Sequence, residues 1–107
     1  MSLEYADEQF SQAVYLMATA REDINRRLLD AVRTTIGFVR SEELPSPVRE
    51  DYDDLIERLT RIPMREGDAG YDGTFEATIM QISTDEAVEL AKEICDFASR
   101  LARLQRG

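Results

Sequence analysis

The sequence contains no histidine, and its single cysteine is Cys95. Histidine is the most common general base near neutral pH and a frequent ligand of zinc and redox metals. Its absence therefore excludes most catalytic triads and most sites for these metals. One cysteine cannot form an internal disulfide, which predicts a reducing, cytoplasmic location. We expect no catalytic residue, no metal site and no cofactor.

Long hydrophobic runs are also missing. None approaches the ~18 apolar residues that a transmembrane helix needs. The first residues, Met1 to Glu8, are acidic and lack the positive start and apolar core of a signal peptide. The chain has 107 residues, of which 43% are hydrophobic and 33% charged. These values predict one globular domain, residues 1–107, with no contact to a membrane.

Positive charge is scarce. Thirteen basic residues stand against twenty-two acidic ones, giving a net charge of −9. This balance argues against nucleic acid and anionic lipid as partners, because both are bound by Lys and Arg. Excess acid favours solubility, and it also offers a surface to a basic protein. Lys92 is the only lysine, and arginine prefers fixed pairing with carboxylates, so we expect ion pairs on or between helices.

The segment from Ser83 to Leu104 has the strongest pattern in the chain. It opens with a capping box, Ser83-Thr84-Asp85-Glu86, in which a hydroxyl and a carboxylate satisfy helix N–H groups. Its polar residues recur every three or four positions in one narrow stripe, so most of its surface is apolar. A helix of this kind is contacted by neighbours on two or three sides. The pattern predicts the central helix of an all-α fold.

Apolar residues at helical spacing predict further helices over Ala6–Ala18, Arg21–Arg40 and Pro47–Arg61. The proline-containing segment Ser41–Pro47 is the predicted linker. A short helix is predicted over Phe75–Ile82, with a strand as the alternative. The fold class is therefore all-α: a small antiparallel bundle of four helices plus a short helical segment, with a dimer as one form.

Two local features leave alternatives open. Thr19-Ala20-Arg21-Glu22 repeats the capping-box pattern, which favours a break near residues 18–20 over one continuous helix. Thr34, Thr35 and Gly37 weaken the following helix by propensity. Gly37 indicates either close approach of another backbone or fraying.

Carboxylates gather on one predicted helix. The helix over Pro47–Arg61 presents an acidic outer face, and this face is our candidate surface for a basic partner: Glu50, Asp51, Asp53, Asp54 and Glu57.

The last helix carries two apolar seams, one of small residues and one of larger side chains at spacings typical of helix–helix packing. Either the other helices cover both seams or a second copy covers part of them. Since homo-oligomers are usually two-fold, we predict a homodimer through this helix or the first one. The candidate interface comprises Ala87, Leu90, Ala91, Ile94, Phe97, Ala98 and Leu101.

Glu93 and Asp96 form an ExxD pair on one helical face. This pair resembles the ExxD motif of all-α nucleotide pyrophosphohydrolases of the MazG type, in which carboxylates from two helices hold magnesium. The resemblance implies a metal-dependent hydrolase using Glu93 and Asp96. The second motif of that family, EExxE on a preceding helix, is missing, and acids at this spacing are typical of a solvated helix face.

Two other features have mainly structural interpretations. Cys95 adjoins Ile94 on the apolar side of its helix, which predicts a buried, unreactive thiol. Asp68, Asp72, Gly73 and Glu76 match positions of a calcium-binding EF-hand loop, but Ile79 stands where the bidentate Glu belongs. Asp and Gly suit turns in any protein, so a mobile loop is the preferred interpretation.

The sequence thus predicts a noncatalytic protein–protein interaction or regulatory module that is cytoplasmic and self-associating. The alternative function is the metal-dependent hydrolase.

Overall fold

The computed structural model describes residues 3–63 and 73–106. Within these residues the fold is all-α, as predicted, with no strand. Its five α-helices and two 3-10 turns are α1 (Leu3–Thr19), α2 (Ile24–Thr34), η1 (Ile36–Phe38), η2 (Ser41–Glu43), α3 (Ser46–Leu59), α4 (Thr74–Ile79) and α5 (Thr84–Arg106). The short segment after Gly73 is a helix rather than a strand. No helix among the described residues is long and apolar enough to cross a membrane.

The predicted break between the first two helices is confirmed, but a different residue caps the second. Asp23 is the N-cap of α2, and its carboxylate accepts from the Arg26 N–H at 3.0 Å. The Thr19 hydroxyl instead donates backwards to the Tyr15 carbonyl at 2.9 Å. The Arg27 guanidinium crosses the break and donates to the Met17 carbonyl.

α2 ends at Thr34, earlier than the predicted end at Arg40. The hydroxyls of Thr34 and Thr35 donate to the carbonyls one turn back, those of Asp30 and Ala31, at 2.7 and 2.6 Å. Such bonds compete with helix continuation, and the chain passes into η1. A Cβ added at Gly37 would lie 3.2 Å from the Phe75 ring, so the nearest neighbour of this glycine is a side chain rather than the backbone of another element.

Two polar side chains position the short α4. The Asn25 amide donates to the carbonyls of Ile79, the last residue of this helix, and of Ile82, three residues beyond it, at 2.8 and 3.0 Å. The buried Thr78 hydroxyl bonds the backbone of Ile62, just after α3. These contacts hold α4 against α2 and α3.

α5 begins as predicted, with half of the expected capping box. The Ser83 hydroxyl accepts from the Glu86 N–H at 3.1 Å. The Glu86 carboxylate, however, receives the Arg61 guanidinium at 2.7 and 2.9 Å. It thereby joins α5 to the end of α3.

The buried face of α5 is narrower than its composition predicted. It forms one stripe at alternating three- and four-residue spacing: Ala87, Leu90, Ile94, Phe97 and Leu101. The interpretation of Cys95 as a buried residue was wrong, because its side chain is exposed. Leu104, an apolar residue near the end of this helix, is also 41% exposed. Apolar residues therefore occupy more of the surface of α5 than the other helices bury.

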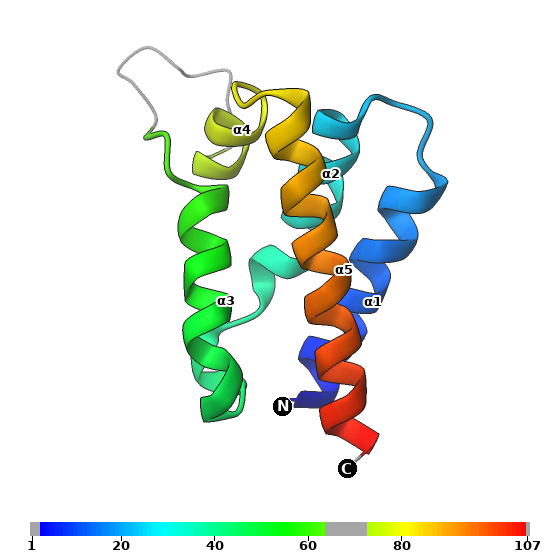
Figure 1. The fold of residues 1–107 in the computed structure, drawn as a ribbon, viewed down its shortest axis with the longest axis vertical. Helices are drawn as coiled ribbons and strands as arrows, with labels where there is room; N and C mark the ends of the chain where they lie inside the picture. The colour runs from blue at the N-terminus through cyan, green and yellow to red at the C-terminus, as the bar shows by residue number, and fades with distance from the viewer. Residues whose placement is uncertain (1–2, 64–72, 107) are drawn as a thin grey trace.

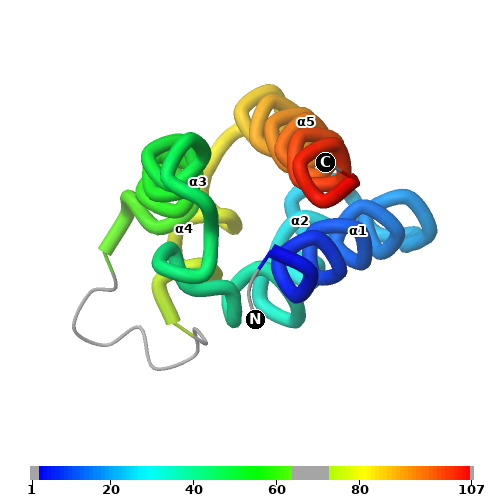
Figure 2. Tube along the Cα trace, turned by 90° about the horizontal axis from the view of Figure 1, so that it is seen from below, coloured from blue at the N-terminus to red at the C-terminus, as the bar shows by residue number. Residues whose placement is uncertain are grey.

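The helices are unevenly packed. α5 packs most extensively against α1, then against α2, and only along an edge against α3. α1 begins at the end of the molecule where α5 finishes (Figure 1). Seen from below, α1, α2 and α5 lie together while α3 stands to one side (Figure 2). Phe10, Tyr52 and Phe97 join α1, α3 and α5 in one aromatic cluster, with ring centroids 4.8 to 6.2 Å apart.

Candidate functional site

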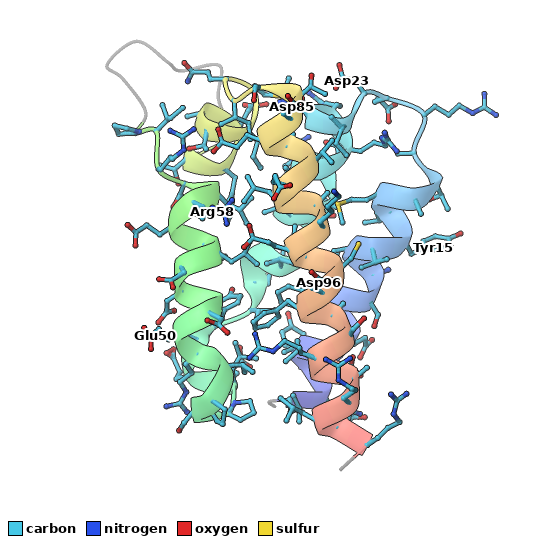
Figure 3. The ribbon with its side chains drawn as sticks, in the orientation of Figure 1. Tyr15, Asp23, Glu50, Arg58, Asp85 and Asp96 are labelled. Atoms are coloured by element: carbon cyan, nitrogen blue, oxygen red, sulfur yellow. The ribbon has the colours of Figure 1, made fainter. Side chains whose placement is uncertain are left out.

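A groove of about 530 Å³ lies between α3 and α5. Charged side chains from both helices form its rims. Five are carboxylates and two are guanidinium groups: Asp51, Asp54, Glu57, Glu93, Asp96, Arg58 and Arg100. Figure 3 shows Arg58 on α3 and Asp96 on α5 on either side of the space between these helices.

The floor of the groove is apolar. Leu55 and Phe97 line it from α3 and α5, and both belong to the core, at 3% and 4% exposed. The Arg100 guanidinium lies 5.6 Å from the Phe97 ring centroid, within the range of a cation–π contact. An occupant of the groove would therefore meet hydrocarbon below it and charge on both sides.

Three ion pairs connect α3 and α5, and we call them the cross-helix ion pairs. Arg61 binds Glu86, Arg58 binds Glu93, and Asp51 binds Arg100 at 2.6 Å. As residue numbers rise on α5 they fall on α3, because the two helices run in opposite directions. The general expectation that arginines pair between helices is confirmed.

The regular pairing is interrupted in the middle of the groove. Asp54 lies three residues after Asp51 and four before Arg58, and Asp96 lies three after Glu93 and four before Arg100. By this register, Asp54 and Asp96 occupy facing positions between two cross-helix ion pairs. Both line the groove, and among the described residues neither carboxylate has a hydrogen bond or ion pair. We call these two residues the central acidic pair.

The predicted acidic surface is divided by the fold. Asp51, Asp54 and Glu57 line the groove, while Glu50 and Asp53 do not. Glu50 lies on the side of α3 away from α5 (Figure 3). The five carboxylates therefore do not form one surface. Three of them contribute to a site that also needs α5.

The ExxD pair lies in the same groove. Glu93 is paired with Arg58, and Asp96 belongs to the central acidic pair. Among residues 3–63 and 73–106, no group of three or more potential ligands is arranged to hold a metal ion. The possible calcium ligands Asp68 and Asp72 lie outside the described residues.

Most of the candidate dimer interface lies inside the single chain. Five of its members are buried against α1, α2 and α3: Ala87, Leu90, Ile94, Phe97 and Leu101. Ala91 and Ala98 are partly buried against the same core. A second copy would therefore have to use a different part of the surface.

Cys95 lies beside Asp96 on the outer side of α5. Its pKa is raised, first by partial burial and then by the negative charge of Asp96. A thiol with a raised pKa is a weak nucleophile near neutral pH. Cys95 is accessible without being activated.

Sequence reasoning missed Arg58, Arg61 and Arg100 as parts of the site. The helix over Pro47–Arg61 was expected to present acids outward. Arg58 lies three residues before Arg61, and Arg100 lies seven residues after Glu93. These spacings were the available signal, but they identify partners only when the two helices are known to be antiparallel.

Comparison with protein-family models, curated proteins and solved structures found no match for this chain.

Proposed function

We propose that the protein is a noncatalytic interaction module whose α3/α5 groove binds a basic, amphipathic segment of a partner protein. The observation that carries the proposal is the central acidic pair, Asp54 and Asp96. Two carboxylates that face each other across a groove repel each other. A Lys or Arg side chain placed between them would attract both carboxylates and offset this repulsion.

The shape of the groove supports a peptide segment as the occupant. A volume of about 530 Å³ is in the range of ordinary binding clefts. Leu55 and Phe97 provide an apolar floor, which suits the nonpolar face of a helix laid between two others. The excess of carboxylates over guanidinium groups on the rims favours a peptide helix with positive charges on its two flanks.

The test uses a synthetic amphipathic peptide of lysine and leucine as the probe, with binding measured by fluorescence anisotropy. Asp54→Lys is expected to weaken binding about tenfold, because it replaces attraction by repulsion in the groove. Asp53→Lys is the matched control, since it makes the same charge change on the same helix outside the groove. Equal effects of both variants would mean that net charge alone attracts the probe, and the proposal would fail.

The metal-dependent hydrolase is retained as the second candidate. One observation favours it: Glu93 and Asp96 face Asp54 and Glu57 from the opposite helix in the same groove. The Arg58–Glu93 ion pair weighs against it, because a metal ion would have to displace that guanidinium. Melting curves with and without Mg²⁺ or Mn²⁺ test this candidate. It requires a rise of several degrees that is absent in Glu93→Gln.

The finer architecture is also a proposal. We propose that α1, α2, α3 and α5 act as an antiparallel four-helix bundle closed at one end by α4. The alternating directions of these helices support it (Figure 1). Self-association and a cytoplasmic location likewise stay predictions.

A further inference from the structure

An exposed aromatic side chain lies in η1 and does not line the α3/α5 groove. Phe38, in η1, is 64% exposed. It borders a hollow of about 460 Å³ whose other lining residues are Tyr5, Arg40, Glu42 and Glu43. A phenylalanine exposed beside a hollow is unlike an isolated surface apolar residue, because the two together can both insert and receive a side chain.

The turn that carries Phe38 is fixed to the core by its neighbouring residues and by hydrogen bonds. Its neighbours Ile36 and Val39 are buried, at 0% and 6% exposed. The Tyr52 hydroxyl donates to the carbonyls of both, at 3.3 and 2.6 Å. The Phe38 N–H donates to the Thr35 carbonyl at 3.1 Å. Phe38 is therefore fixed facing outward, and little backbone order would have to be gained on binding.

The rim of the hollow carries both signs of charge. The Glu43 carboxylate accepts from the Arg40 backbone N–H at 2.9 Å, so it is used within the chain. The Arg40 guanidinium and the Glu42 carboxylate are exposed, and neither has an ion pair with another described residue. One cation and one anion without an ion pair among the described residues thus line the hollow together with the aromatic residues.

We propose that this surface (Tyr5, Phe38, Arg40 and Glu42) is a two-fold interface with a second copy of the chain. Phe38 of each copy enters the hollow beside Tyr5 of the other, and Arg40 of each copy pairs with Glu42 of the other. This goes beyond the proposed peptide-binding function, because it uses a different surface and a different partner.

Charge complementarity selects a second copy as the occupant. A two-fold contact needs a patch that is complementary to itself. Phe38 with the hollow, and Arg40 with Glu42, meet this requirement. A strongly acidic partner would be repelled by Glu42 and Glu43, and a strongly basic one would bring like charge against Arg40. The apolar stripe of α5 does not compete for this role because it is buried within the chain.

The first experiment is sedimentation velocity on the full chain over a concentration series, at about 0.15 M salt to screen the net charge of −9. We expect a concentration-dependent shift from the 12.2 kDa monomer to a dimer. Phe38→Ser should raise the dimer dissociation constant about thirtyfold, as for an interface aromatic that carries much of the binding energy. Tyr15→Ser is the control, because Tyr15 is 65% exposed and outside the hollow.

A second experiment tests the two-fold arrangement itself. Arg40→Glu and Glu42→Arg should each be monomeric, since like charges then meet twice across the interface. Mixing the two variants should restore dimers, all of them heterodimers, because each substituted side chain then faces an opposite charge. Size-exclusion chromatography with light scattering, with one variant carrying a mass tag, measures this outcome. Circular dichroism confirms that the exposed substitutions leave the helices intact.

A chain that stays monomeric at all concentrations would overturn the proposal, and so would a dimer that Tyr15→Ser dissociates and Phe38→Ser does not. Failure of the mixed variants to associate would overturn the pairing of Arg40 with Glu42. None of these outcomes bears on peptide binding at the α3/α5 groove, which Asp54→Lys tests separately.

Discussion

The hydroxyl of Thr78 bonds both backbone groups of Ile62, accepting from its N–H at 2.9 Å and donating to its carbonyl at 3.2 Å. A single side chain in α4 thus satisfies the chain just after α3, where no helical partner is available. Thr78 is fully buried, so water cannot replace it.

Replacement of Thr78 by the isosteric valine should therefore destabilise the protein by about 2–3 kcal/mol, because two backbone groups lose their partner. Thr78→Ser keeps the hydroxyl and loses one methyl group, for a cost of about 1 kcal/mol. Urea unfolding followed by circular dichroism measures both values. A serine variant less stable than the valine variant would contradict the role given to the hydroxyl.

Tyr52 should make the protein sensitive to alkali. Burial raises the pKa of Tyr52 above its usual value, and the charges of Asp53 and Glu43 add to the shift. The unfolded chain loses this proton above about pH 10, whereas the folded chain retains it. Folding then binds a proton, so stability is complete below pH 10 and falls as the pH rises, by about 1.4 kcal/mol per unit.

Tyr52→Phe removes this titration. The variant loses about 1–2 kcal/mol near neutral pH, because the hydroxyl no longer bonds the carbonyls of Ile36 and Val39. Its stability should decline less steeply than that of the native chain between pH 10 and 11.5. Parallel slopes in urea unfolding would show that the Tyr52 proton is not linked to folding.

Cys95 should react with a disulfide reagent such as DTNB without denaturant, because its side chain is exposed. Its raised pKa predicts a slow reaction at pH 7 that accelerates about tenfold per pH unit until the thiol ionises. Asp96→Asn removes one cause of the shift and should increase the rate at pH 7. A thiol that reacts only in urea would restore the original prediction of a buried residue.

Asp54→Lys should stabilise the free protein. The lysine would face Asp96 and complete the series of cross-helix ion pairs, and it would lie near Glu50, Asp51 and Glu57 on its own helix. An exposed pair of this kind contributes about 0.2–1 kcal/mol, which raises the melting temperature by a few degrees. Asp53→Lys corrects for the change in net charge, and the difference between the variants should shrink in about 1 M salt.

Local signals in the sequence were sufficient for the helices themselves. Ser83 was recognised as a cap because a hydroxyl three residues before a glutamate has a direct structural consequence. The end of α2 was misplaced because Thr34 and Thr35 have modest effects on propensity, while their bonds to carbonyls one turn back depend on the conformation adopted. Cys95 was misplaced because apolar residues surround most of α5, and composition does not say which side the neighbours cover.

The groove between α3 and α5 could not be predicted from local sequence signals. Acidic residues on the helix over Pro47–Arg61 were noticed, but the pairing of Arg58 with Glu93 joins residues far apart in sequence. It requires the direction and register of two helices, which no short motif encodes. Likewise Phe38 was placed inside a continuous helix, and its exposure follows from the turn that ends α2.

The cross-helix ion pairs also restrict how α3 can slide along α5. A slide of one helical turn, about 5.4 Å, that brought each residue of α3 opposite the α5 residue four positions earlier would set Asp54 against Glu93 and Asp51 against Asp96. Glu93 and Asp51 would each lose an arginine partner and face a carboxylate instead. The carboxylates that we propose attract a basic partner therefore also favour a single alignment of the two helices, and a variant in which several of them are neutralised should tolerate a second alignment.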